Sequence, residues 1–156
     1  MSAADPMGGA VDPGWLDELV AAWRGHVEAG APEGGPAAVR LLACFAEGGV
    51  WEDVAAQAVY RGHTELRQMF EQSYQWSPTL AFDVVRARGG TDHYVIEWEM
   101  HAAGNGAFGD LPASDRPFRV RGVSVGEVGP DGRVTAHRDY WDRHVWLEQV
   151  GLAVGS

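Results

Sequence analysis

The stretch HYVIEWEMHA, residues 93–102, alternates between two kinds of side chain along its whole length. One side of an extended chain would carry the apolar residues Tyr94, Ile96, Trp98 and Met100. The other side would carry Val95 together with Glu97, Glu99 and His101. Because successive side chains of a β-strand point to opposite faces, this period of two predicts a strand with one face in the core.

The same alternation with a period of two continues in the segments on both sides of this stretch. Further strands are predicted at residues 80–88, 117–128 and 133–142, with turn signals at Arg88-Gly89-Gly90 and Pro130-Asp131-Gly132. Residues 103–116 are rich in Gly, Ala and Pro and longer than a hairpin needs. This segment is predicted to form a mobile loop at the mouth of a pocket.

Four charged residues are expected on the outer face of the sheet. Arg119 and Arg121 have the parity opposite to the apolar residues of their own strand. Glu97 and Glu99 could therefore pair with them across neighbouring strands. We interpret this group as a surface or subunit-interface feature rather than a catalytic one, because exposed ion pairs are common and weak.

The first half of the chain has a helical period instead. Apolar residues recur at helical spacing in three segments: Leu16, Leu19, Val20, Trp23 and Val27; Val39, Leu42 and Phe45; and Leu66, Met69 and Phe70. The second helix is predicted to stop at Gly48-Gly49, before a short strand over Val50–Asp53, and the third to run over residues 64–76. Helices followed by antiparallel strands predict an α+β fold. We expect one domain, residues 12–152, behind a flexible Gly- and Ala-rich tail, residues 1–11.

The composition of the chain excludes or disfavours several classes of partner and of reaction. The 156 residues carry a net charge of −10, which disfavours nucleic acid and anionic membrane surfaces as partners. The chain has no Lys, which excludes Schiff-base and pyridoxal chemistry, and no apolar run long enough to span a membrane. The single cysteine, Cys44, is expected to be a buried hydrophobe, which fits a cytoplasmic location. The six histidines show no pair at ligand spacing, so neither a metal nor a cofactor is expected.

Three stretches together resemble a known family. They are Val50-Trp51-Glu52-Asp53 followed by Tyr60-Arg61-Gly62; the segment GAFGDLPASDR at residues 106–116; and DGR at 131–133 through HRDYWD at 137–142 to QVGL at 149–152. In order and spacing they are similar to the SnoaL-like polyketide cyclases of the nuclear transport factor 2-like superfamily. The resemblance implies a curved antiparallel sheet wrapped by three N-terminal helices into a cone, and a homodimer formed through the convex sheet face.

The resemblance also implies catalytic residues. An inward carboxylate is the acid-base group of these cyclases, and it falls on Asp139, with Asp53 opposite. His137 shares a strand face with Asp139 and could relay or tune its proton. Each has a structural alternative: Asp139 could pair with a neighbouring Arg, Asp53 could cap a turn, and His137 could be a core residue. A carboxylate in an apolar pocket has a raised pKa and can take a proton from an activated carbon.

Aromatic and apolar side chains near these carboxylates are candidates for binding a flat hydrophobic substrate, or for plain core packing: Trp51, Trp98, Met100, Phe70, Tyr74 and Trp141. The implied function is a cofactor-independent cyclase that closes a ring in a polyketide or related secondary metabolite, as in antibiotic biosynthesis. An isomerase or a lyase of the dehydratase type remains an alternative, as does a non-catalytic ligand-binding or dimerisation domain.

Epoxide opening is a further alternative, because limonene epoxide hydrolase is related to this family. That enzyme family uses an Arg-x-Asp pair on one strand, and the corresponding positions here are Trp98 and Met100. Its chemistry would regain support if Glu97 or Glu99 faced the pocket beside Asp139.

Overall fold

The computed structural model describes residues 16–22 and 36–152. Residues 16–22 form a helix. The elements that follow are α2 (Pro36–Ala43), β1 (Phe45–Asp53), β2 (Ala58–Arg61), α3 (Gly62–Trp76), β3 (Ala81–Gly89), β4 (His93–Ala102), β5 (Phe118–Val128), β6 (Val134–Trp141) and α4 (Arg143–Gln149). The predicted tail at residues 1–11 lies outside the described residues, as do Trp23 and Val27 of the first predicted helix.

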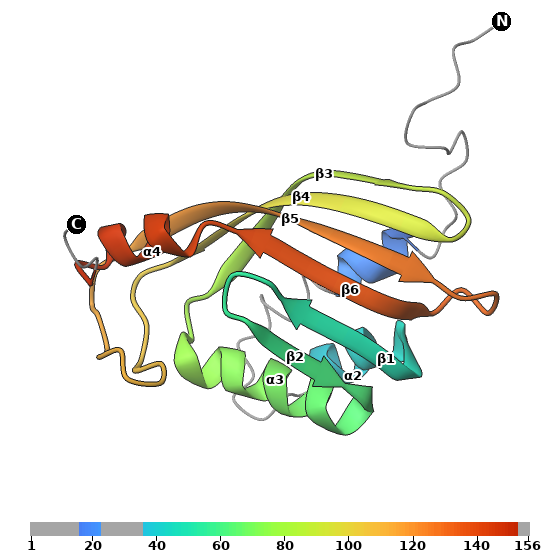
Figure 1. Cartoon of the computed structure of the whole chain (residues 1–156), viewed down its shortest axis with the longest axis horizontal. Helices are drawn as coiled ribbons and strands as arrows, with labels where there is room; N and C mark the ends of the chain where they lie inside the picture. The colour runs from blue at the N-terminus through green and yellow to red at the C-terminus, as the bar shows by residue number, and fades with distance from the viewer. Residues whose placement is uncertain (1–15, 23–35, 153–156) are drawn as a thin grey trace, which may run out of the picture.

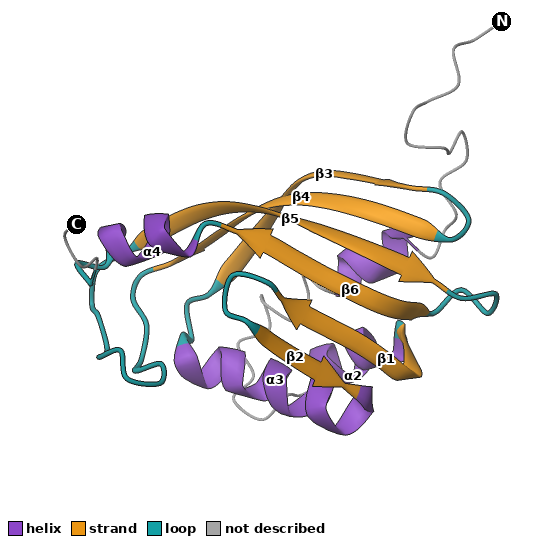
Figure 2. Ribbon diagram, in the orientation of Figure 1, coloured by secondary structure: helices purple, strands orange, loops and turns teal. Residues whose placement is uncertain are grey.

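The strands form one six-stranded curved sheet in the order β2-β1-β6-β5-β4-β3 (Figure 1). The neighbouring strands pair antiparallel except β1 and β6, which are parallel. The prediction of a wholly antiparallel sheet was therefore wrong at this pair. The first strand can lie beside the last only because the chain between them folds back through α3 and the β3–β5 meander (Figure 2). The α+β prediction is confirmed.

The helices gather on one side of the sheet. Helix α3 contacts β1, β2 and α2, and Figure 1 shows α2 and α3 beneath the β1–β2 end of the sheet. Leu66 and Phe70 carry the apolar stripe of α3 and are almost fully buried. A fourth helix, α4, follows β6 and was not predicted; Asp142 caps its N-terminus by accepting hydrogen bonds from the backbone of His144 and Val145.

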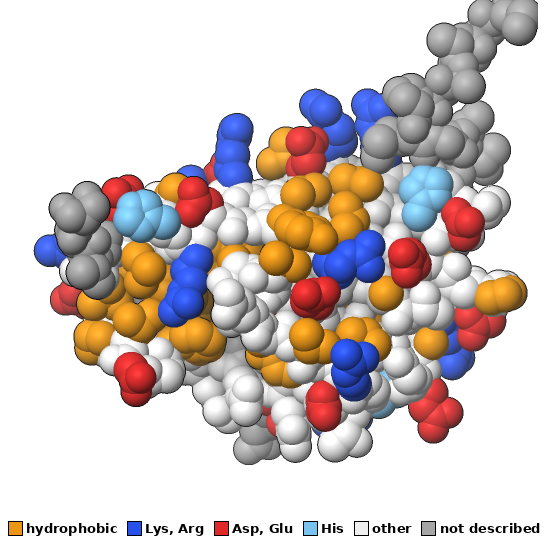
Figure 3. Space-filling view, in the orientation of Figure 1, with side chains coloured by type: hydrophobic (Ala, Val, Ile, Leu, Met, Phe, Trp, Pro, Cys, Tyr) orange, Lys and Arg blue, Asp and Glu red, His pale blue; other side chains and the backbone are white. Residues whose placement is uncertain are grey.

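The predicted alternation of β4 is confirmed. Its apolar side faces the core, with Tyr94, Ile96, Trp98 and Met100 each at most 6% exposed. On the outer face, Glu99 pairs with both Arg119 and Arg121, whereas Glu97 pairs with Arg86 of β3. Figure 3 shows hydrophobic side chains on the viewed surface interspersed with arginines and acidic residues.

The predicted C-terminal end of the second helix, at Gly48-Gly49, was wrong. Helix α2 stops at Ala43, and Phe45 begins β1. The pairing of β1 with β6 shifts between Phe45 and Val50, so Gly49 lies in a bulge. A Cβ there would lie 3.0 Å from the carbonyl oxygen of Val134, so Gly49 permits close backbone approach within a strand. Neither Gly48 nor Gly49 ends a helix, because both lie in β1. Cys44, expected to be buried, is only partly so.

Candidate active site

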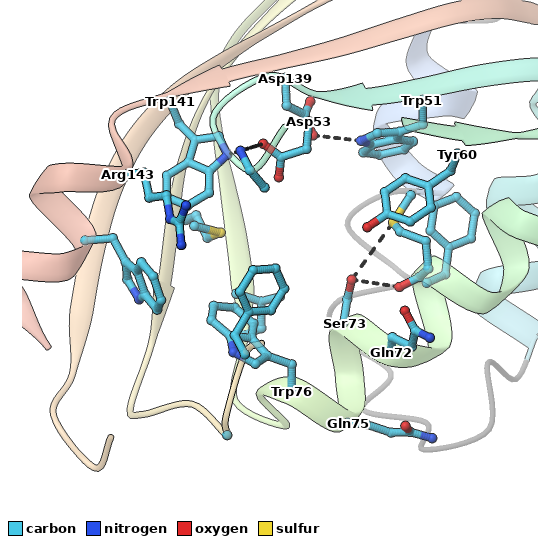
Figure 4. A pocket seen from close by; sticks show the side chains of 18 of the residues that line it. Trp51, Asp53, Tyr60, Gln72, Ser73, Gln75, Trp76, Asp139, Trp141 and Arg143 are labelled. Carbon is cyan, nitrogen blue, oxygen red and sulfur yellow. Dashed lines mark hydrogen bonds between the residues drawn. The ribbon is translucent and has the colours of Figure 1, made fainter. Parts of the chain in front are cut away.

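The parallel pairing of β1 with β6 brings two carboxylates together. Asp53 and Asp139 are Cα partners in its register, as are Trp51 and His137. Residues paired in register on adjacent strands point to the same face, which here is the concave, apolar one. Figure 4 shows the two carboxyl groups side by side at the top of the cavity. The sequence prediction that Asp53 lies opposite Asp139 agrees with this register.

Asp139 is buried and accepts three hydrogen bonds. Trp51 Nε1 donates to its Oδ2 at 2.9 Å, while Ser124 Oγ at 2.5 Å and His137 Nε2 at 2.8 Å both contact Oδ1. A carboxylate has about four lone-pair sites, so one remains on Oδ2. Donors of this kind stabilise a negative charge that burial would otherwise penalise.

A second layer lies behind Asp139. His137 is 2% exposed, and its Nδ1 lies 2.5 Å from the hydroxyl of Tyr94. Complete burial, followed by the charge of Asp139, raises the pKa of Tyr94 well above its ordinary value. The hydroxyl therefore stays protonated and can donate a hydrogen bond to Nδ1. The other ring nitrogen is then free to donate its hydrogen to Asp139.

Ser124 links Asp139 to another buried side chain. Trp98 Nε1 donates to Ser124 Oγ at 2.8 Å, and Ser124 in turn donates to Asp139. The position of Trp98 depends on Gly122, because a Cβ there would lie 2.2 Å from the Trp98 ring. Trp98 therefore packs behind the site and does not line the cavity, although it was predicted to bind substrate.

Asp53 is the more open of the two carboxylates. Its Oδ1 accepts from Trp141 Nε1 at 2.9 Å and from the backbone of Ala56 at 3.0 Å. Burial is the largest cause that raises the pKa of Asp53, and the charge of Asp139 adds to it. Asp53 thus holds a proton more readily than an exposed aspartate does.

A cavity of about 490 Å³ opens in front of the two carboxylates, which is within the range of small-molecule sites. Its walls come from α2, β1, β2, α3, β3, β4, β6, α4 and the loop at residues 106–109. Mostly apolar side chains line it: Leu41, Trp51, Tyr60, Met69, Phe70, Trp76, Leu80, Phe82, Met100, Phe108, Trp141 and Trp146. Polar groups other than the carboxylates come from Gln72, Ser73, Gln75 and Arg143 (Figure 4).

Most of the predicted site residues meet at this cavity. Asp53, Asp139, Trp51, Phe70, Met100 and Trp141 line it, and so does part of the predicted mouth loop. His137 lies behind Asp139 and contacts the cavity through it. Tyr74 belongs to α3, but its side chain lies outside what the structure describes.

Several site residues were not found from the sequence. Ser124 is the cross-strand partner of Asp139, yet a bulge after Glu127 breaks the register of the hairpin. Counting straight from the Val128↔Val134 pair would place Val123 opposite Asp139. Tyr60 and Arg143 lie in β2 and α4, two elements that were not predicted.

No group of three or more His, Cys, Asp or Glu residues suited to a metal ion occurs within residues 16–22 and 36–152. In the same residues, no helix has the length and apolar character of a membrane span.

Comparison with solved structures identifies the architecture. A proposed SnoaL-like polyketide cyclase from Jannaschia sp. CCS1 aligns with a TM-score of 0.74 at 16% identity, over 94% of this chain and 100% of that one. TsrD from Streptomyces laurentii aligns with a TM-score of 0.72 at 20% identity, over 91% and 98%. A hypothetical protein of ketosteroid isomerase-like fold from Catenulispora acidiphila, in complex with trimethylamine, aligns with a TM-score of 0.67 at 22% identity, over 86% and 93%.

These likenesses establish the ketosteroid isomerase-like, or nuclear transport factor 2-like, fold that the resemblance implied. No curated protein matches the chain. The family model described as "SnoaL-like domain" matches residues 33–137, which is more than half of the sequence. The chain therefore belongs to the SnoaL-like domain family.

Proposed function

We propose that this protein is a cofactor-independent acid-base enzyme that closes a ring in a polyketide or related secondary metabolite. The observation that carries the proposal is the in-register pair Asp53 and Asp139 at the end of a mostly apolar cavity. Two carboxyl groups that interact share protons as a unit, so one can be ionised while the other is protonated. Such a pair supplies a base and an acid without a cofactor.

The contacts suggest which carboxyl does which step. Asp139, whose carboxyl group accepts from three donors, acts as the base, and the lone pair left on its Oδ2 takes a proton from a carbon between two carbonyl groups. The resulting enolate attacks a second carbonyl of the same molecule and forms the carbon–carbon bond. Asp53, with its raised pKa, gives its proton to the oxygen that becomes an alkoxide. The pair ends with its one proton exchanged between members, and solvent restores the starting state.

The cavity supports substrate folding as a second contribution. Trp51 packs edge to face against Phe70, with ring centroids 5.5 Å apart, and Phe82 packs in the same way against Trp98, with ring centroids 5.3 Å apart. Fixed aromatic walls favour a compact conformation in which the two reacting carbons are close, which removes entropy from the barrier. An isomerase or dehydratase would use the same pair, with a hydrogen shift or loss of water in place of the bond formation.

Epoxide opening by the related triad receives no support. Glu97 and Glu99 lie on the outer face in ion pairs with arginines, so neither stands beside Asp139. A purely structural role for the pocket is also disfavoured, because its volume is large enough for a small molecule. The trimethylamine bound to the Catenulispora protein fits a small-molecule partner for this fold.

We further propose a homodimer formed through the outer sheet face, in a cytoplasmic setting. Val85 of β3 and Tyr140 of β6 are 60% and 42% exposed, and a second copy packed on the outer face would remove such apolar surface from water. Sedimentation of the purified protein would test the dimer, and a monomer at micromolar concentration would contradict it.

The function is tested by mass spectrometry of metabolites from the source organism. Strains would carry the wild-type gene, a deletion, Asp139→Asn or Asp53→Asn, with Asp115→Asn as a matched control because Asp115 is exposed outside the cavity. We expect the deletion and both site variants to accumulate an uncyclised precursor, and Asp115→Asn to match the wild type.

Other outcomes separate the alternatives. If Asp139→Asn gives the wild-type profile while the deletion does not, acid-base catalysis by this pair is wrong and only catalysis by shape remains. An unchanged profile on deletion would remove the enzyme proposal and leave a binding or assembly role.

A further inference from the structure

Two buried hydrogen-bond donors at one end of the cavity have no partner. The indole N–H groups of Trp76 and Trp146 are shielded from solvent and find no acceptor within the described residues. Trp146 is only 2% exposed, and the two rings meet edge to face at 5.9 Å. Buried polar groups are nearly always paired in native proteins, because leaving one unpaired costs free energy. Both tryptophans line the cavity, so a bound molecule can supply the missing acceptor.

A cation lies at the same end. Arg143, the first residue of α4, is the only Arg or Lys among the described residues that line the cavity. It forms no ion pair with another described residue, although the chain has a net charge of −10. Its neighbour Asp142 uses its carboxylate to cap α4 instead. The guanidinium therefore remains available to a ligand.

The walls around these donors are aromatic. The ring centroids of Trp141 and Trp146 are 6.4 Å apart, and those of Trp76 and Phe118 are 5.9 Å apart. Figure 4 shows Trp141 and Arg143 on one side of the cavity and Trp51 and Tyr60 on the other, with Trp76 below them on α3. This end presents flat apolar surfaces together with three donors and no carboxylate other than the Asp53 and Asp139 pair above it.

We propose that Arg143 and the indole N–H groups of Trp76 and Trp146 form a subsite for a carboxylate carried by a flat, multi-ring or polyketide-like substrate. A guanidinium binds a carboxylate through two parallel hydrogen bonds, and indole N–H groups complete the set of donors. This inference rests on the proposed function and names its substrate class: an acid, not a neutral ester or amide.

The subsite would also orient the substrate. Asp139 and Asp53 repel an anionic group, while Arg143 attracts it, so the carboxylate end is held at the aromatic side of the cavity. The opposite end of the molecule then faces the carboxylate pair. Charge, and not shape alone, would thus select which carbon meets the base.

Binding of two matched compounds tests the subsite. Anthraquinone-2-carboxylate and anthraquinone-2-carboxamide have nearly the same shape and differ in charge, and isothermal titration measures their affinities for the full-length protein. We expect the wild type to bind the carboxylate about tenfold more tightly than the amide, equivalent to about 1.4 kcal/mol. Arg143→Gln should abolish that preference by weakening the carboxylate alone. Arg133→Gln, an exposed arginine outside the cavity, should leave both affinities unchanged.

A second variant tests the indole donors. Trp146→Phe keeps a buried ring but removes its N–H, and should weaken both compounds because each carries a carbonyl oxygen. The proposal is overturned if the wild type binds neither compound, binds both equally, or if Arg143→Gln weakens both alike. Circular dichroism would confirm that each variant is folded.

Asp53→Asn separates this inference from the proposed function. It should retain the preference for the carboxylate, since it removes a negative charge and no donor of the subsite. If the preference holds while Asp53→Asn and Asp139→Asn leave the metabolite profile unchanged, the subsite stands and the cyclase proposal fails. If the metabolite profile changes as expected but the preference is absent, the cyclase stands and its substrate is not an acid.

Discussion

The hydrogen bond between Tyr94 and His137 depends on a glycine. Gly126 is the cross-strand partner of both residues, and the ring of Tyr94 lies over it. A Cβ at position 126 would lie 2.0 Å from Cζ of Tyr94 and 2.3 Å from its hydroxyl oxygen. Real side chains do not approach so closely, so Gly126→Ala must displace Tyr94. The tyrosine is 1% exposed and has no open space into which it could move.

The cost can be worked from these contacts. Overpacking a core costs about 1–3 kcal/mol, and leaving the Tyr94 hydroxyl or the His137 ring nitrogen unpaired adds a similar amount. The lower chain entropy of unfolded Ala offsets about 1 kcal/mol of this. We expect Gly126→Ala to lose about 3 kcal/mol of the free energy of unfolding, or roughly 10 °C of Tm in a domain of this size.

A matched glycine provides the control for this experiment. Gly48, in β1, has no heavy atom within 4 Å of a built Cβ, so Gly48→Ala should lose no stability and should gain up to about 1 kcal/mol from the lower entropy of the unfolded chain. Urea denaturation and calorimetry measure both variants. A loss below about 1 kcal/mol for Gly126→Ala would refute the described position of Tyr94. In a Tyr94→Ala background, Gly126→Ala should cost far less, because its clash is gone.

Three further predictions concern the site and its support. Burial raises the pKa of Asp53 above its ordinary value of 3.8, so at pH values between the unfolded and the native pKa the native state binds more protons than the unfolded chain, and wild type loses stability as the pH rises through this range. Asp53→Asn should therefore raise Tm relative to wild type at pH 7 and lose that advantage below about pH 3.8. An advantage independent of pH would contradict the raised pKa of Asp53. Ser124→Ala should cost about 1–3 kcal/mol in urea denaturation by leaving the Trp98 indole N–H unpaired, whereas a neutral effect would show that this bond contributes nothing. Asp142→Ala removes the cap of α4 and should cost about 1 kcal/mol in thermal denaturation, with weaker binding of anthraquinone-2-carboxylate because α4 carries Arg143; unchanged Tm would count against the cap.

Local pattern was enough to predict most of the sheet. The strict alternation of β4 gave its inward residues correctly, and the outward pairing of Glu99 with Arg119 followed from strand parity alone. These features depend on the period of a single strand, which neighbouring residues determine. The aspartate pair came instead from resemblance to a family, and the structure agrees with it because β1 and β6 happen to be in register at that point.

Features that depend on bulges and distant contacts were not predictable in this way. Gly48-Gly49 has the composition of a helix stop, but the local shift of β1 against β6 places it inside a strand. Trp98 has the parity of a pocket residue, yet the missing side chain at Gly122 lets its ring turn toward Ser124. Helix α4 was missed although Asp142 is a favourable N-cap, because its seven residues are too few to show a clear period.

The hydrogen bonds that join the first and last strands have a consequence for synthesis of the protein. Trp51 to Asp139 and Trp141 to Asp53 each connect residues 88 positions apart. Contacts so distant in sequence form late in folding, because a long loop must close before they contribute any energy. A chain still on the ribosome holds Asp53 on its own and has no pair until β6 has been translated. The proposed acid-base pair is therefore absent from any fragment that ends before Asp139.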